Sequence, residues 1–321
     1  MQQKDYSFDY VRTIATFIII SGHFNLYCSG NSGLGRLLGG GGFFLFFFLS
    51  ALLFGSKWCH NDKQPFDGVV FMKQRIKRIG SSLWPFLIAL LAVFYLLDID
   101  FSIVNAFLNF VFLGYIGKLP GNGHLWFLTI LIVCYAEFLL LSRINISNSV
   151  LLLVVLLGLV MYLISEIIGI PGHTFLTIGI SALVFEKADY LLSLSQSIPK
   201  YLLLILLLLT TFIMLLLFDN SMYDNHRLFA YPLMAFCGIV WLITMIGLFP
   251  NKKSLVISFL SQISFEMYLV HHTFCAGPAF RVSQIGGPTL LQFSCLVLIS
   301  IIAAYLLHLL SNCFVKAFEK K

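Results

Sequence analysis

The sequence predicts an all-α polytopic membrane protein, from its composition and from the form of its apolar runs. Of its 321 residues, 59% are hydrophobic and only 11% are charged, whereas soluble domains usually carry about 25% charged residues. The runs are continuous, as in Leu151–Val160 and Leu202–Leu217, and therefore lack the alternation of an outer-membrane β-barrel. This composition also excludes a disordered chain, a nucleic-acid-binding domain and a disulfide scaffold.

Apolar runs long enough to cross a bilayer, which takes about 20 residues, recur along the chain. About ten spans are predicted, beginning near residues 8, 40, 82, 124, 149, 172, 200, 228, 256 and 288. The segment 101–116 is a weaker eleventh candidate because it contains Asn105 and Asn109. Residues 1–321 are expected to form a single integral-membrane domain, because the longest polar stretch, 57–80, is too short to fold alone.

Basic residues set the predicted orientation, because cytoplasmic loops carry the excess of lysine and arginine. The loop after the second span is rich in both, from Lys57 to Arg78, so this loop and both chain termini are expected to be cytoplasmic. If segment 101–116 does not cross, few basic residues remain outside: Arg36, Lys118, Arg227 and Arg281. We therefore expect this segment to be re-entrant or to lie along the outer interface.

The chain contains seven cysteines, and neither their pattern nor the first apolar run indicates a processed, disulfide-bonded secreted protein. The cysteine count is odd, no CxxC occurs, and most cysteines lie inside apolar runs, so they are expected to be small buried side chains. The first run contains Arg12 and lacks a small-residue cleavage site. It therefore reads as a retained helix and not as a cleaved signal peptide.

Polar side chains interrupt the first predicted helix. Arg12 and His23 are eleven residues apart, close to three helical turns, so they share one face and lie about 16 Å apart along the axis. Asp9 precedes Arg12 by three residues and can neutralise it. Ionisable groups at membrane depth usually face a cavity. We therefore expect Arg12 and His23 to line one path through the membrane. The alternative is that Arg12 snorkels to the interface and His23 bonds to a neighbouring helix.

A second polar stripe lies near the end of the chain. Ser264, Tyr268, His271 and His272 fall at i, i+4, i+7 and i+8, on one face of a helix. In the predicted orientation His271 and His23 both lie toward the outer half, so the two histidine faces can close one site. The alternative is hydrogen bonding between helices. Glu266 lies on a different face.

The loop before the third span carries four clustered cations, Lys73, Arg75, Lys77 and Arg78. Arginine pairs bind phosphate through bidentate hydrogen bonds. The alternative is that these residues set the orientation of the chain and contact anionic lipid.

Five segments resemble the motifs of acyltransferase family 3 and occur in the family's order along nearly the whole chain. The first, FDYVRTIATFIIISGH, has the family's Arg or Lys, ten residues, then His. The others are GGGGFFLFFFLSALLFG, the Arg-x-x-Arg of RIKR, GHLWFL and SFEMYLVHH. Two departures are that Ala51 stands where a glycine is usual, and that the proline usual just after the Arg-x-x-Arg motif is missing.

The resemblance implies a membrane enzyme that moves an acetyl or other acyl group from acetyl-CoA to a hydroxyl of a cell-envelope glycan or its lipid-linked precursor. It implies a bacterial inner membrane location, with membrane lipid as the surroundings. A permanently bound cofactor, a metal and a nucleic-acid partner are not expected. Acetyl-CoA is expected as the donor substrate, with its charged end docked on the cytoplasmic face.

The resemblance also implies catalytic and binding roles for individual residues. His23 is expected to be the base that takes the hydroxyl proton, since an imidazole is suited to this near neutral pH. An acyl-histidine intermediate on His23 remains the alternative. Arg12 would hold the coenzyme or polarise the thioester. Tyr268 and His271 would orient the acceptor or donate to the oxyanion. The phosphates would be bound by Arg75 and Arg78, together with Lys73 and Lys77.

Two other classes of protein fit the same polar faces: a transporter or flippase for an envelope precursor, and an assembly subunit of a polysaccharide machine.

The glycines and phenylalanines of the second predicted span allow two hypotheses. Its glycines, Gly39–Gly42, can line a slot for the pantetheine arm, or they can mark a tight helix contact beside lipid-facing phenylalanines, Phe43–Phe48. Three other histidines, His60, His226 and His308, are expected to be surface or packing residues.

Overall fold

The computed structural model describes residues 5–144, 146–168, 172–217 and 227–319, so His226 lies outside the described residues. Every regular element in these ranges is a helix, as the continuous apolar runs predict. The contacts divide the chain into two compact units. Unit 1 consists of residues 1–22, 31–67 and 136–261, and unit 2 consists of residues 23–30, 68–135 and 262–321.

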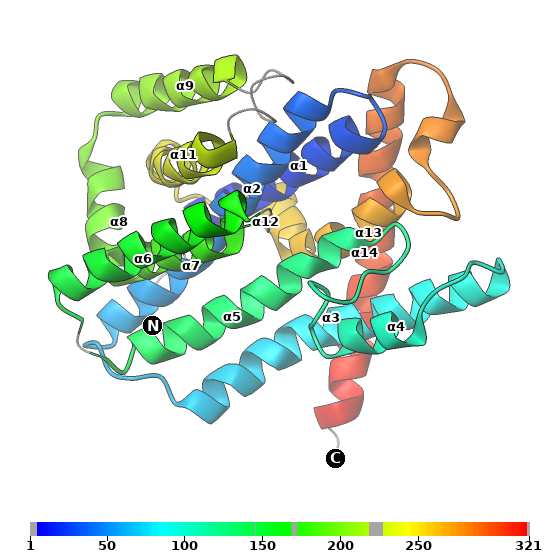
Figure 1. Ribbon diagram of the computed structural model, residues 1–321, viewed down its shortest axis with the longest axis horizontal. Coiled ribbons are helices and arrows are strands. Elements are labelled where there is room, and N and C mark those ends of the chain that lie inside the picture. The colour runs from blue at the N-terminus through cyan, green and yellow to red at the C-terminus, as the bar shows by residue number, and fades with distance from the viewer. Residues whose placement is uncertain (1–4, 145, 169–171, 218–226, 320–321) are drawn as a thin grey trace. The chain divides into compact units, whose positions relative to one another are not determined.

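Unit 1 is a bundle built around the second helix of the chain. Its helices are α1 (Ser7–Tyr27, as far as Gly22), α2 (Ser32–His60), α6 (Asn148–Ile167), α7 (His173–Glu186), α8 (Ala188–Ser197), α9 (Lys200–Leu217), α11 (Arg227–Leu248) and α12 (Leu255–Gln262). Helix α2 packs against α7 and α11, α6 packs against α7, and α9 lies beside α11 (Figure 1).

The glycine run of α2 is a close helix contact. A Cβ added at Gly41 would meet the Trp241 ring at 2.6 Å, and one at Gly42 would meet Ile19 at 2.7 Å. Helices α1 and α2 approach so closely that a Cβ on Gly22 would collide with the backbone of Gly39. Of the predicted pair of hypotheses, the tight contact is therefore the one observed. The phenylalanines are not lipid-facing as that hypothesis supposed, because Phe43, Phe44, Phe47 and Phe48 are buried in the core.

Unit 2 contains α3 (Gly68–Leu96), α4 (Ile103–Phe110), η1 (Gly123–Leu125), α5 (Trp126–Leu141, as far as Tyr135), α13 (Ser264–Ala276), η2 (Val282–Ile285) and α14 (Thr289–Glu319). Helix α13 packs along α14, and α3 packs against both of them. The last five residues of α1, beginning at His23, also belong to this unit.

Six helices in the described part of the chain are long and apolar enough to cross a membrane, or seven if α8 and α9 form one broken span. This is fewer than the predicted ten. The span expected from residue 256 is divided into α12 and α13, and α7, with 14 residues, is about 21 Å long. Helices α8 and α9 meet at a bend of 111°. The cytoplasmic position of the termini stays a prediction.

Segment 101–116 contains one short helix. Helix α4 has 8 residues and is therefore about 12 Å long, too short to cross a hydrocarbon core of about 30 Å. Asn109 folds the chain back after it, because its side-chain amide donates to the carbonyl of Gly117 at 2.6 Å and to that of Asn105 at 2.8 Å. The segment therefore does not form an eleventh helical span.

Candidate functional site

Four histidine rings meet in unit 2. His23 comes from the end of α1, His124 from η1, and His271 and His272 from α13. The ring centroids of His23 and His271 lie 5.0 Å apart, and those of His124 and His272 lie 4.4 Å apart. We call these four residues the histidine cluster. His23 is partly buried, whereas the other three rings are buried.

A glycine turn brings the segment before α5 onto the end of α13. Gly121 has φ of 62°, a left-handed conformation that glycine adopts at little cost. A Cβ at this position would meet the carbonyl oxygen of Ala276 at 2.6 Å and the backbone of Gly277 at 2.5 Å. Since the two backbones touch, the Gly121 carbonyl accepts a hydrogen bond from His272 Nδ1 at 2.6 Å.

Hydrogen bonds fix the protons of the central pair. His271 Nδ1 lies 2.8 Å from the carbonyl oxygen of Tyr268, which can only accept, so this nitrogen carries a proton. In a neutral ring Nε2 of His271 is then an acceptor. It lies 2.7 Å from Nδ1 of His23, which must donate. The other nitrogen of a neutral His23, Nε2, therefore keeps its lone pair and can accept a proton.

The other two histidines are held by the same kind of bond. His272 donates through Nδ1 to Gly121, as described above, and His124 donates through Nε2 to the Leu269 carbonyl at 3.2 Å. Nδ1 of His124 is then an acceptor, and it is buried without a hydrogen-bond partner among the described residues. Within these residues no group of three or more His, Cys, Asp or Glu side chains is arranged to hold a metal ion.

Tyr268 supports the cluster through the backbone. Its hydroxyl donates to the carbonyl oxygen of His124 at 2.6 Å, and the side chain is 5% exposed. Because its proton is engaged there, this arrangement favours a positioning role for Tyr268 over donation to an oxyanion.

The sequence predicted that His23 and His271 meet, and the structure brings them together. It did not single out His124. The signal was present, since this histidine is the second residue of GHLWFL, which directly follows a turn of Pro120, Gly121 and Asn122. Nothing in the local pattern, however, indicates that the turn packs on a helix that begins 140 residues further along the chain.

Arg12 lies in unit 1, where it joins α1 to α12. Its guanidinium donates to Ser261 Oγ at 3.2 Å, and Ser261 donates to Asp9 Oδ1 at 3.0 Å. Asp9 also lies 3.8 Å from the guanidinium, which is the pairing expected from their spacing. The Arg12 side chain is 34% exposed.

The four cations of the basic segment lie on the first half of α3, in unit 2. Arg75 is partly buried, with its guanidinium carbon 5.8 Å from the centre of the Phe71 ring. Lys73, Lys77 and Arg78 are exposed. Arg75 and Arg78 are three residues apart and share a face of the helix, whereas Lys73 and Lys77 share another.

The arginine face of α3 continues to a buried polar network in the same unit. Ser82, four residues beyond Arg78, donates to Glu266 Oε1 of α13 at 2.8 Å. His308 of α14 lies 3.3 Å from the same oxygen, and its other nitrogen lies 3.2 Å from the side-chain amide of Gln262. Glu266 is fully buried. The network therefore fixes the start of α13, five residues before His271, against the arginine-bearing helix.

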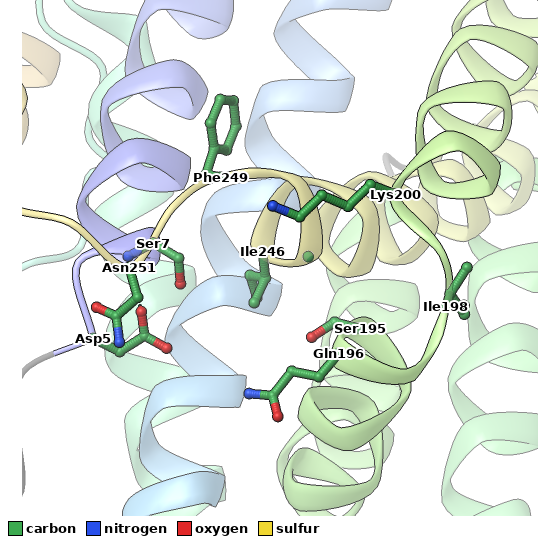
Figure 2. Close-up of a pocket in the computed structure, with 10 residues that line it drawn as sticks. Asp5, Ser7, Ser195, Gln196, Ile198, Lys200, Ile246, Phe249 and Asn251 are labelled. Atoms are coloured by element: carbon green, nitrogen blue, oxygen red, sulfur yellow. Dashed lines mark hydrogen bonds between the residues drawn. The ribbon is translucent and has the colours of Figure 1, made fainter.

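A pocket of about 220 Å³ lies elsewhere, in unit 1 (Figure 2). Asp5 and Asn251 line one side of it and Lys200 another, and none of the predicted site residues contributes to its lining. The side-chain oxygen of Asn251 accepts a hydrogen bond from the backbone N–H of Tyr6 at 2.8 Å. Part of the polar lining therefore binds the segment just before α1.

In a comparison with known protein families, residues 5–309 match acyltransferase family 3, which is described as an acyltransferase domain. Comparisons with curated proteins and with solved structures each gave no match. The matched range contains every residue of the histidine cluster, Arg12 and all four cations of α3. Because the match covers nearly the whole chain, this protein belongs to acyltransferase family 3.

Proposed function

We propose that this membrane acyltransferase is an O-acetyltransferase of the bacterial inner membrane. It takes the acetyl group from cytosolic acetyl-CoA and transfers it to a hydroxyl of a cell-envelope glycan or its lipid-linked precursor. Family membership supports acyl transfer in general. The observation that carries the site is the chain of hydrogen bonds from His23 through His271 to the Tyr268 carbonyl, which leaves a basic nitrogen on His23.

In the proposed reaction His23 Nε2 takes the proton of the acceptor hydroxyl as its oxygen attacks the thioester carbonyl carbon. The C–S bond then breaks, the thiolate of coenzyme A leaves, and an oxygen ester remains on the acceptor. The positive charge that forms on His23 is stabilised because its Nδ1–H donates to His271, which is itself held by the Tyr268 carbonyl. A positioned base of this kind contributes about 10²–10⁴-fold in rate.

The same nitrogen supports a second route. Nε2 of His23 can attack the thioester itself and form an acyl-imidazole, which the acceptor hydroxyl then cleaves. The two routes differ in whether an acetylated enzyme accumulates when acetyl-CoA is supplied without acceptor. Rapid acid quenching followed by mass spectrometry of the peptide containing His23 distinguishes them.

Arg75 and Arg78 are the proposed phosphate ligands of coenzyme A, since two guanidinium groups on one helix face suit bidentate binding. Lys73 and Lys77 contribute charge from the neighbouring face. The buried Ser82–Glu266 contact supports this assignment, because it ties the arginine-bearing helix to the helix that carries His271. Arg12 is proposed to hold the coenzyme or polarise the thioester, with Asp9 and Ser261 orienting its guanidinium.

The experiment is acetyl transfer by the purified protein in lipid nanodiscs, with labelled acetyl-CoA and envelope glycan as acceptor. His23→Ala should lower the rate about 10²–10⁴-fold. The matched control is His60→Ala, because His60 is an exposed histidine of α2 that bonds only within its own helix and to Asp189 in the described contacts. Wild-type rates in a folded His23→Ala protein would remove His23 from the mechanism.

One observation favours the rival class of transporters. Helices α8 and α9 of unit 1 meet at a bend of 111°, and broken helices are typical of transporter binding sites. Movement of a lipid-linked glycan across proteoliposomes without any acetyl donor would support that function. An assembly subunit is distinguished differently: acetylation in cells would then be lost on deleting the chain and retained in the His23→Ala variant.

A further inference from the structure

Two cysteine side chains meet in unit 2 beside the histidine cluster. Cys28 directly follows α1, five residues after His23, and Cys275 lies in α13, four residues after His271. The Cys28 thiol donates to the Cys275 carbonyl oxygen, with its sulfur 3.6 Å from that oxygen, and the two side chains are close enough to interact electrostatically. Cys275 is fully buried and Cys28 is partly buried.

Cys28 lies in surroundings that favour its thiolate. The neighbouring Cys275 side chain lowers the pKa of Cys28; burial opposes this shift, and the Ser283 backbone and the charge of Arg281 lower the pKa further. Arg281 is fixed nearby, since its Nε donates to the Gly277 carbonyl at 3.1 Å. A partly accessible thiol next to a cation is the usual setting of a reactive cysteine.

We propose that Cys28 and Cys275 form a redox-active dithiol, which closes to a disulfide by exchange with a glutathione-type disulfide. The Cys28 thiolate attacks one sulfur of the oxidant, and a mixed disulfide forms as one thiolate leaves. Cys275 then attacks the Cys28 sulfur, its proton passes to the departing thiolate, and the second thiol is released. One disulfide is reduced to two thiols while the two cysteines are oxidised.

The roles of attacker and resolver follow from accessibility. Cys28 is the partly exposed residue, so it meets the oxidant first, and the buried Cys275 is placed to resolve the mixed disulfide. The predicted orientation agrees with such chemistry, because it puts the end of α1 toward the outer side, away from the reducing cytosol. The inference does not depend on the acyl-transfer reaction, since neither thiol takes part in it.

Closing this bond would tie the segment after α1 to the last turn of α13. These are the two pieces of chain that bring His23 to His271, and the crosslink leaves the imidazoles themselves unchanged. The oxidised protein should therefore unfold at a higher temperature than the reduced protein.

The test is oxidation of the purified protein in nanodiscs with oxidised glutathione, followed by alkylation and digestion without reductant. We expect a peptide pair crosslinked through Cys28 and Cys275, which disappears on reduction, and loss of alkylation at both residues. Cys59→Ser and Cys313→Ser are matched controls that should leave this crosslink intact. Full alkylation of both thiols after oxidation would overturn the proposal.

A second measurement separates the steps. Cys275→Ser should trap glutathione on Cys28, whereas Cys28→Ser should leave Cys275 unmodified. The rise in unfolding temperature on oxidation should be absent in both variants. Stable glutathionylation of Cys28 in the wild-type protein, with no crosslink formed, would show that Cys275 does not resolve the mixed disulfide and would also overturn the proposal. The wild-type readout requires no substitution, so a poorly folded variant does not weaken the test.

Discussion

The hydroxyl of Tyr268 holds the backbone carbonyl of His124 at 2.6 Å, across 144 positions in sequence. One helical side chain thereby fixes the turn that carries a member of the histidine cluster. Both groups are buried, so neither can replace this hydrogen bond with one to water. The positions of His124 and, through stacking, of His272 depend on this contact.

Removing that hydroxyl should loosen the cluster. Tyr268→Phe removes the side-chain donor to the His124 carbonyl, which then keeps only the backbone N–H of Trp126, and loss of such a hydrogen bond costs about 0.5–1.5 kcal/mol. The unfolding temperature and the initial rate of acetyl transfer should both fall. Tyr95→Phe is the control, because Tyr95 is 82% exposed on α3. Equal effects of the two substitutions would contradict the supporting role.

His271 should act through His23. His271→Ala removes the acceptor of the His23 proton, and a hydrogen bond to a charged group contributes about 1.5–3 kcal/mol, so the rate should fall roughly 10–100-fold. The loss should fall on kcat, with KM for acetyl-CoA little changed. His271→Gln should recover part of it, because the glutamine carbonyl can accept from Nδ1 of His23. If the Gln and Ala variants are equally slow in steady-state kinetics, orientation is not the role of His271.

The arginines of α3 should matter more than its lysines. Hydrogen bonds to charged groups contribute about 1.5–3 kcal/mol, so Arg75→Ala or Arg78→Ala should raise KM for acetyl-CoA roughly 10- to 100-fold. Lys73→Ala and Lys77→Ala should have smaller effects, since they act as point charges. Arg78→Lys should not restore binding, because lysine lacks the bidentate fork. The same KM for all four alanine variants would indicate a diffuse electrostatic effect.

Glu266 should contribute to stability through its partners. Glu266→Ala leaves Ser82 and His308 facing an empty buried site, and breaking a buried pair of this kind costs about 3–5 kcal/mol. Glu266→Gln keeps the volume and an oxygen that accepts from Ser82, so its cost should be much smaller. Unfolding of both variants in detergent, followed by circular dichroism, measures the difference. Similar midpoints for Ala and Gln would show that the network is not held by this oxygen.

Helix packing in unit 1 should tolerate a methyl group at one glycine of α2 and not at another. A Cβ on Gly55 would collide with the Phe185 carbonyl and with Ala188 at 2.8 Å, whereas one on Gly39 would meet nothing within 4 Å. Gly55→Ala should therefore destabilise the protein by about 1–3 kcal/mol, and Gly39→Ala should not. Thermal unfolding of the two variants, which carry the same added atom, is the direct comparison.

The residues of the site that sequence could predict are those that share one element. Arg12 and His23 follow from spacing along α1, and the stripe of Tyr268 and His271 from spacing along α13. His124 could not be found in this way, because its place depends on the Gly121 turn meeting the end of α13. Contacts of that kind are long in sequence and leave no periodic pattern.

The breaks in the helices were also beyond the sequence pattern. The run through α12 and α13 has only a few polar residues around Ile263 and is apolar beyond them, so hydropathy alone predicts one span. The break instead accompanies polar contacts on either side: Ser261 turns to Asp9 in unit 1, and Glu266 turns to Ser82 in unit 2. Counting apolar runs therefore overestimated the number of uninterrupted spans.

The pairing of Asp9 with Arg12 has a consequence for biogenesis. The two charges sit one turn apart on α1 and compensate each other as soon as that turn forms, whereas Ser261 is synthesised 249 residues after Arg12. The nascent first helix can thus leave the ribosome and enter the translocon as an electrically balanced unit. The arginine gains its later hydrogen bond only after Ser261 has been made.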